Sequence, residues 1–211
     1  GLSILLMDYR TLSSPKMLLP TGVLREWKSG SKRADIIVVT NTPSMLSPLE
    51  RRIAQKEIKP KPHQSIYFSY VKYGDLTPAF TESLSENHSI DGNAVKSRMF
   101  GMDKTFYFER GYSILLLTGI ANPSPLKEQL EENISELIHL EFSDHREYSM
   151  ADIVKVQKIF DNIVNSNKII VTTEKDIMRL TVPGLMKILK KLAIFYIPIE
   201  VAFHNGDGLK F

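Results

Sequence analysis

SILLLTGIANP, residues 113–123, joins an apolar run to a glycine turn and the start of a helix, and it decides the fold class. Residues 114–117 are apolar without alternation, which indicates a parallel strand covered by helices on both faces. Gly119 follows at once, and Pro123 closes the turn as the expected first residue of a helix. The carboxyl end of such a strand is the edge at which open α/β sheets bind ligands.

The composition is that of an ordinary globular protein, with 211 residues of which 43% are hydrophobic and 24% are charged. The formal net charge is only +3, whereas nucleic-acid binding requires a dense basic surface, so we expect no DNA or RNA partner. The sequence has no cysteine, which excludes disulfides and thiolate chemistry. No apolar run approaches the roughly 20 residues that span a bilayer, and we expect a cytoplasmic topology.

Strand-like and helix-like stretches alternate along the chain, which predicts an α/β fold with a mostly parallel sheet and helices on both faces, an α/β/α sandwich. The sequence also predicts a surface excursion over residues 74–104 and a terminal β-hairpin around its last glycines. The expected strands are residues 3–7, 34–40, 65–71, 105–108, 114–117, 139–142, 168–172 and 194–199, and the expected helices include 44–58, 125–133, 149–164 and 183–192.

Three polar loops follow expected strands, at residues 119–123, 143–146 and 173–176. Parallel strands place all their carboxyl ends at one edge of a sheet, and each loop also leads into a helix, which is the geometry that receives phosphate. Each loop has a plainer alternative as well: a simple turn at Gly119, a satisfied polar loop at Asp144 and His145, and a helix cap at Thr173 and Asp176.

His145 is the residue of these loops best suited to proton chemistry near neutral pH. The sequence contains no G-x-x-x-x-G-K-[ST] phosphate loop, the motif that usually holds a triphosphate. No His, Asp and Glu spacing indicates a metal site.

Five motifs, LLPTGVLRE, RADIIVVT, LTGIANP, FSDHR and TTEKDIMRL, occur in the order and spacing of the tetraacyldisaccharide 4'-kinases, and the chain resembles that family except over residues 74–104. The resemblance implies transfer of the γ-phosphoryl group of ATP, with Mg²⁺, to the 4'-hydroxyl of an acylated glucosamine disaccharide 1-phosphate in lipid A biosynthesis. It also implies a peripheral enzyme on the inner face of the bacterial inner membrane. The family has two α/β domains, and the phosphate loop and catalytic Asp lie in the N-terminal one.

The resemblance carries roles to individual residues. Arg25 and Glu26 would lie near the nucleotide phosphates and Mg²⁺. Asp144 and His145 would be catalytic, with His145 hydrogen-bonded to the catalytic Asp of the N-terminal domain. Many relatives have a second His where this chain has Arg146.

Two sets of residues remain as candidates for nucleotide or phosphate binding. Gly119 and Asn122 belong to the loop at residues 119–123, whose geometry suits phosphate. The family's T-E-K-D motif matches Thr173, Glu174, Lys175 and Asp176, and the resemblance implies interdomain or nucleotide-side structure for it.

We therefore expect residues 1–26 to be a remnant of the N-terminal kinase domain, 27–198 to be the C-terminal α/β domain, and 199–211 to be a hairpin returning towards the N-terminal domain. The polar, Gly- and Ser-rich stretch at residues 27–33 marks the first border. On this interpretation the chain lacks most of the N-terminal domain and is inactive alone. The alternative is a non-catalytic α/β module that binds a sugar phosphate or nucleotide.

One further stretch of the sequence is a candidate for contact with a membrane. MKILKKLAIFYI, residues 186–197, places three lysines beside apolar residues and could touch anionic lipid. We favour the alternative of a helix and strand with a solvated basic edge.

Overall fold

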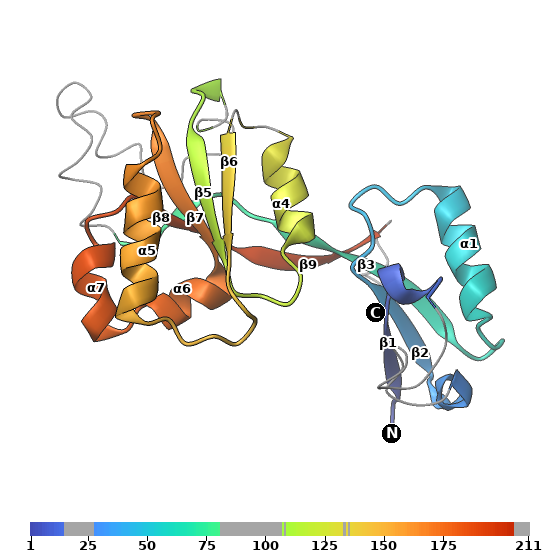
Figure 1. Cartoon of the computed structure of the whole chain (residues 1–211). Helices are drawn as coiled ribbons and strands as arrows, with labels where there is room; N and C mark the ends of the chain where they lie inside the picture. Colours follow the sequence, from blue (N-terminus) through green and yellow to red (C-terminus); the bar gives the residue numbers. More distant parts are fainter. Residues whose placement is uncertain (15–27, 81–106, 108, 133, 135, 205–211) are drawn as a thin grey trace. The chain divides into compact units, whose positions relative to one another are not determined.

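The computed structural model describes the whole chain except residues 15–27, 81–106, 108, 133, 135 and 205–211 (Figure 1). The chain forms two compact units. One consists of Gly1–Lys72 with Ile199–Phe211, and the other of Tyr73–Pro198.

The unit Tyr73–Pro198 is built on a five-stranded sheet with the strand order β4-β8-β7-β5-β6 (Figure 1). Strands β5, β6, β7 and β8 are parallel, and only β4 pairs antiparallel, with β8. In the register, Leu115 of β5 lies opposite Ile138 of β6 and Ile170 of β7. The strands are β4 Thr77–Pro78, β5 Ser113–Thr118, β6 Glu136–Glu141, β7 Lys168–Thr173 and β8 Ile194–Ile197.

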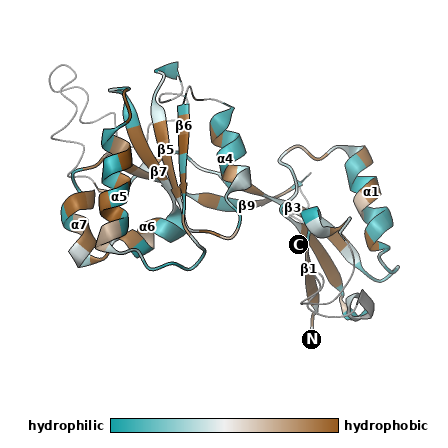
Figure 2. Ribbon diagram, viewed as in Figure 1, coloured by the Kyte–Doolittle hydropathy of each residue, from teal (hydrophilic) through white to brown (hydrophobic). Residues whose placement is uncertain are grey.

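Strand β5 is buried at all six positions and supplies both faces of the sheet. Leu115 and Leu117 pack into a core with residues of α5, α6 and α7, whereas Ile114 and Leu116 pack into a second core with α4. The predicted arrangement of a mostly parallel sheet with helices on both faces is therefore confirmed. The helices are α4 Ser124–Glu131, α5 Met150–Asp161, α6 Glu174–Leu180 and α7 Pro183–Leu189. Figure 2 shows hydrophobic residues along the strands and hydrophilic ones on α4.

The other unit has a four-stranded sheet with the order β1-β2-β3-β9, in which β1, β2 and β3 are parallel. Helix α1, Pro48–Ile58, begins with a capping box between Ser47 and Glu50 and packs Ala54 and Ile58 against the sheet. The strands are β1 Ile4–Asp8, β2 Ile36–Thr40, β3 Ser65–Tyr73 and β9 Ile199–Phe203, and short 3₁₀ helices span Tyr9–Thr11 and Lys28–Arg33.

These units divide the chain differently from the domain borders expected from the sequence. Strands β2 and β3 group with β1, because β2 pairs with β1 from Ile4 opposite Ile36 to Asp8 opposite Thr40. The segment from Ile199 contributes β9 beside β3, and the rest of the predicted hairpin lies outside the described residues.

Several details refine the expected elements. Pro123 is the residue that precedes α4 and not its first residue, so the helix begins at Ser124. Within the predicted strand at 105–108 the structure describes Tyr107, which is helical, so the strand prediction is wrong at that residue. Most of the predicted excursion at 74–104 lies outside the described residues, although Thr77–Pro78 forms β4. Among the helices that the structure describes, none is long and apolar enough to cross a bilayer.

Candidate active-site edge

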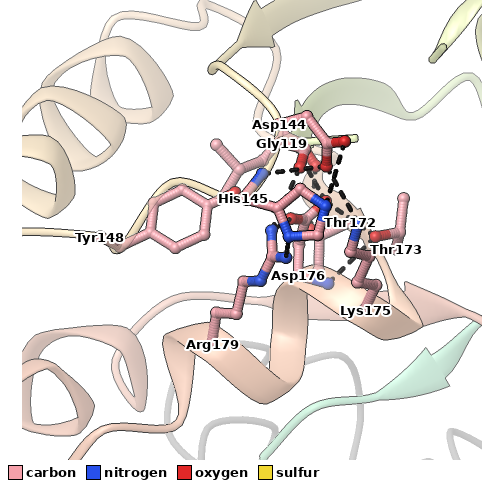
Figure 3. A network of polar contacts seen from close by, with 10 residues as sticks. Gly119, Asp144, His145, Tyr148, Thr172, Thr173, Lys175, Asp176 and Arg179 are labelled. Carbon is pink, nitrogen blue, oxygen red and sulfur yellow. Dashed lines mark hydrogen bonds and ion pairs between the residues drawn. The ribbon is translucent and has the colours of Figure 1, made fainter. Parts of the chain in front are cut away.

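Asp176 is a fully buried carboxylate at the start of α6, at the carboxyl edge of the five-stranded sheet (Figure 3). The hydroxyl of Thr173, which caps α6, accepts a hydrogen bond from the Asp176 amide at 3.1 Å and donates to Asp176 Oδ2 at 2.7 Å. The same Oδ2 accepts from the Gly119 amide at 2.9 Å, and Oδ1 accepts from the Tyr148 hydroxyl at 3.2 Å. One carboxylate thus joins the loop after β5, the loop before α5 and the first turn of α6.

Close packing at Gly119 favours a glycine. A Cβ there would lie 2.8 Å from the Tyr148 hydroxyl oxygen, closer than a real Cβ approaches, and 3.0 Å from Asp176 Oδ1, a tight contact. Burial, followed by the neighbouring charge of Asp176, raises the pKa of Tyr148. Tyr148 therefore stays protonated and donates a hydrogen bond to Asp176.

Asp144 and His145 lie in the loop after β6, and this pair is open to solvent. The His145 side chain is 75% exposed, and its backbone has the left-handed φ of 61°, with its amide donating to Asp144 Oδ1 at 2.9 Å. The Lys175 ammonium group lies 2.9 Å from the same oxygen, and this hydrogen bond is the main cause that lowers the pKa of Asp144. Asp144 is therefore an ionised carboxylate at neutral pH.

Arg179 connects the exposed pair to the buried carboxylate (Figure 3). Its Nη2 lies 3.2 Å from Nδ1 of His145, while its Nη1 donates to the Gly119 carbonyl at 3.3 Å and lies 3.7 Å from Asp176 Oδ1. The Nε2 of His145, on the other side of the ring, is 3.5 Å from Asp144 Oδ2.

The sequence interpretation missed Tyr148 and Arg179. The signal for Arg179 was helical spacing, since it follows Lys175 by four residues and Asp176 by three, which places all three on one side of α6. Tyr148 gave no such signal, because nothing in the sequence distinguishes it from other loop aromatics.

The structure brings most of the candidate site residues to this edge. Six of them meet in the network described above: Gly119, Asp144, His145, Thr173, Lys175 and Asp176. Asn122 accepts a hydrogen bond from the Ser124 amide in the turn before α4, and Glu174 is exposed in the first turn of α6. Arg25 and Glu26 lie outside the described residues.

Arg146 makes contacts within the fold, with Asp152 and Phe142. Its guanidinium Nη2 lies 2.8 Å from Asp152 Oδ1, and it stacks over the Phe142 ring. Asp152 in turn completes the capping box of α5 with Ser149.

Some polar groups at this edge are used in internal hydrogen bonds, whereas others stay exposed to a ligand. The Gly119 amide, the Thr173 hydroxyl and both Asp176 oxygens are engaged in internal hydrogen bonds, which favours the plainer alternatives of turn and cap for them. Asp144, His145 and Lys175 keep exposed side chains that a ligand can reach. In the part of the chain that the structure describes, no three His, Asp or Glu side chains cluster closely enough to hold a metal ion.

Comparison with known proteins identifies the family. The model of the family described as "Tetraacyldisaccharide-1-P 4'-kinase" matches residues 1–210. A tetraacyldisaccharide 4'-kinase of Phocaeicola vulgatus is 37% identical over 203 residues, covering 96% of this chain and 51% of the relative. The enzyme of the same name from Bacteroides thetaiotaomicron is 36% identical over 211 residues, covering 100% of this chain and 53% of the relative.

A solved structure also matches, that of the "apo" form of LpxK from Aquifex aeolicus in complex with ATP. Its TM-score is 0.51 at 18% identity, covering 99% of this chain and 50% of the other, and it supports the fold. The chain thus spans about half the length of the curated relatives it matches. Because the family model extends over nearly every residue and the relatives agree, the chain belongs to the tetraacyldisaccharide-1-P 4'-kinase family.

Proposed function

We propose that this chain is part of an ATP-dependent lipid kinase that phosphorylates the 4'-hydroxyl of tetraacyldisaccharide 1-phosphate, giving lipid IVA in lipid A biosynthesis. The observation that carries the proposal is the family match over residues 1–210. The relatives named for this activity and the ATP complex of the Aquifex aeolicus structure support it.

In this proposal the chain supplies only part of the active site. Phosphoryl transfer depends on donors and cations that surround the phosphates, and these come chiefly from a phosphate loop and Mg²⁺. The 211 residues contain no such loop, so we assign it to an N-terminal domain of the same protein. Among the described residues no three His, Asp or Glu side chains cluster into a metal site. We therefore assign the Mg²⁺ ligands to the phosphates of ATP and to the N-terminal domain.

The proposed contribution of this chain is the exposed pair of Asp144 and His145. Its open position at the sheet edge allows a carboxylate of the N-terminal domain to approach the His145 ring. By hydrogen bonding to that carboxylate, His145 would hold it in position to accept the proton of the attacking 4'-hydroxyl.

We also propose that the whole enzyme works on the cytoplasmic face of the bacterial inner membrane as a peripheral protein. Its proposed substrate carries acyl chains, which keep the disaccharide at a membrane surface. Lys187, on α7, belongs to the basic stretch that could touch lipid, and we retain the interpretation of a solvated edge for that stretch.

The kinase proposal is tested with the full-length protein, ATP and tetraacyldisaccharide 1-phosphate. We expect phosphorylated product from the wild type, and a kcat for His145→Ala that is lower by roughly 100-fold to 10,000-fold with little change in KM for ATP. His63→Ala is the matched control, since His63 is an exposed histidine in the other unit.

Two outcomes would overturn parts of the proposal. A wild-type protein that binds a nucleotide or sugar phosphate without transferring phosphate would favour the non-catalytic module. Equal kcat values for His145→Ala and His63→Ala would remove the role assigned to His145.

A further inference from the structure

We propose that Arg179 is a positioning residue that fixes the neutral His145 ring in the tautomer with its proton on Nε2, so that the outward nitrogen is always a hydrogen-bond donor. The contact that carries this inference is the 3.2 Å approach of Arg179 Nη2 to His145 Nδ1. Its consequence for catalysis rests on the proposed function, whereas the contact itself does not.

The hydrogen-bonding chemistry of the Arg179 guanidinium and the neutral His145 imidazole allows only one position for the ring proton. A guanidinium group has only donors, so Nδ1 must offer its lone pair to Arg179. A neutral imidazole carries one proton, which is therefore on Nε2. Nε2 faces Asp144 Oδ2 at 3.5 Å, and a carboxylate on that side is an acceptor, so both sides of the ring agree on the same tautomer.

Arg179 is itself held in place, which a positioning residue requires. Its side chain is only 23% exposed, and its Nη1 lies between the Gly119 carbonyl and the fully buried Asp176 carboxylate. The buried network of Asp176 therefore fixes the guanidinium, and the guanidinium orients the exposed ring.

Helix α6 orients the other half of the pair as well. Lys175 lies one turn before Arg179 on the same side of the helix and holds Asp144 through a 2.9 Å ion pair. One short helix thus determines how both members of the exposed pair face the solvent.

This tautomer matches the task proposed for His145. To hold a carboxylate of the N-terminal domain, the ring must present a donor, and the Arg179 contact keeps the proton on Nε2. The incoming carboxylate would accept the hydrogen bond from Nε2 in place of Asp144, which lies 3.5 Å away. In serine proteases a carboxylate also fixes the tautomer of a histidine, but it accepts a hydrogen bond from the Nδ1 proton, whereas Arg179 donates one to Nδ1.

The contact is tested first by nitrogen NMR of the His145 ring in the 211-residue chain, at a pH where the ring is neutral. In the wild type we expect Nδ1 to resonate as an unprotonated nitrogen and Nε2 as a protonated one. In Arg179→Met the two shifts should move towards each other as both tautomers become populated. His204, in the other unit, is an internal control whose ring shifts should not change.

Arg179→Lys is a second variant, needed in case Arg179→Met does not fold. It keeps a cation beside Asp176 but lacks the fork that reaches Gly119 and His145 together, so we expect the His145 shifts of Arg179→Met in a folded protein. Wild-type shifts in both variants would overturn the proposal.

The catalytic consequence is tested by a double-mutant cycle in the full-length protein. Arg179→Lys should lower kcat by about 10-fold to 100-fold with little change in KM for ATP, and should have almost no further effect in a His145→Ala background. Losses that multiply would show that Arg179 acts apart from His145, and would overturn its role as a positioning residue. If the wild type shows no kinase activity, the proposed function fails, while the NMR experiment still decides whether Arg179 fixes the ring.

Discussion

Asp176 is the residue on which the stability of the sheet edge most depends, because its two oxygens serve Gly119, Thr173 and Tyr148 without solvent. Asp176→Asn replaces one carboxylate oxygen by an NH₂ group. This group cannot accept the hydrogen bonds that the oxygen receives from its neighbours. We expect the free energy of unfolding to fall by about 2–4 kcal/mol, measured by urea denaturation. Glu174→Gln, an exposed change in the same helix, is the control and should leave the midpoint nearly unchanged. A midpoint for Asp176→Asn equal to that of the control would contradict this prediction.

The glycine at position 119 lies in a tight space beside Tyr148 and Asp176. Gly119→Ala places a methyl group against the Tyr148 hydroxyl and Asp176, and should cost about 1–3 kcal/mol of unfolding free energy. Tyr148→Phe removes the nearest atom, so the same glycine substitution should cost less in that background. Urea denaturation of the four proteins measures both effects. An equal cost in both backgrounds would show that Tyr148 is not the obstacle.

The sequence predicted which polar residues lie at this edge. It did not predict which of them are buried in the fold and which are exposed to a ligand. Asp144, His145 and Asp176 each follow an apolar run, and this placement predicted one shared edge. Whether a carboxylate is buried or exposed depends on side chains from other segments, such as Tyr148 and Arg179, and those contacts form only in the folded chain. The roles of Arg25 and Glu26 stay predictions.

The capping box of α5 predicts a pH-dependent contribution to stability. Ser149 Oγ accepts from the Asp152 amide at 3.3 Å, and Asp152 Oδ2 accepts from the Ser149 amide at 2.9 Å. Ser149→Ala should lower the unfolding free energy by about 1 kcal/mol at neutral pH. Ser124→Ala is the control, because Ser124 begins α4 without a side-chain cap.

The pH dependence of this effect has a definite sign. The Ser149 hydrogen bond is the main cause that lowers the pKa of Asp152 in the folded chain. A lowered folded pKa adds stability at pH values above the unfolded pKa, about 3.9, and this stability is lost as the pH falls through the folded value. The difference between wild type and Ser149→Ala in urea denaturation should therefore shrink from pH 7 to pH 3. A constant difference would contradict the linkage.

The sequence predicted most elements of the described chain but not which sheet each strand joins. The runs in β2 and β5 have the same continuous apolar character, so periodicity alone cannot separate them. Strand pairing is decided by contacts between distant segments, such as β1 with β2. The borders of an element are local and were predicted better: Ser149 caps α5, and Thr173 caps α6.

The unit Tyr73–Pro198 should fold by itself. The two cores on either side of its sheet, and the whole Asp176 network, come from residues within this range. We expect a protein of residues 73–198 to unfold cooperatively in urea and to keep the wild-type NMR shifts of the His145 ring. A protein of residues 1–72, which lacks β9, is the comparison and should be less stable. A non-cooperative transition for residues 73–198 would show that the unit needs the rest of the chain.

We expect the 211-residue chain to fold but neither to bind ATP tightly nor to consume it. A triphosphate needs several converging donors, and at the described sheet edge the Gly119 amide and the Thr173 hydroxyl already donate to Asp176. Lys175 is paired with Asp144, and the sequence has no G-x-x-x-x-G-K-[ST] loop to supply the missing donors. Isothermal titration with ATP and Mg²⁺ should give no measurable heat of binding, and a coupled ATPase assay should give no turnover.

The full-length protein, measured in the same two assays, is the control for this prediction, since there the donors of the proposed N-terminal domain are present. Micromolar ATP affinity of the 211-residue chain, or phosphorylation of the disaccharide by it, would mean that these residues already contain a complete nucleotide site. In that case the exposed groups of Asp144, His145 and Lys175 would have to bind the phosphates directly, which requires Lys175 to leave Asp144. Lys175→Met would then abolish the ATP affinity, whereas under the present proposal neither Lys175→Met nor the unchanged chain gives a measurable heat of binding.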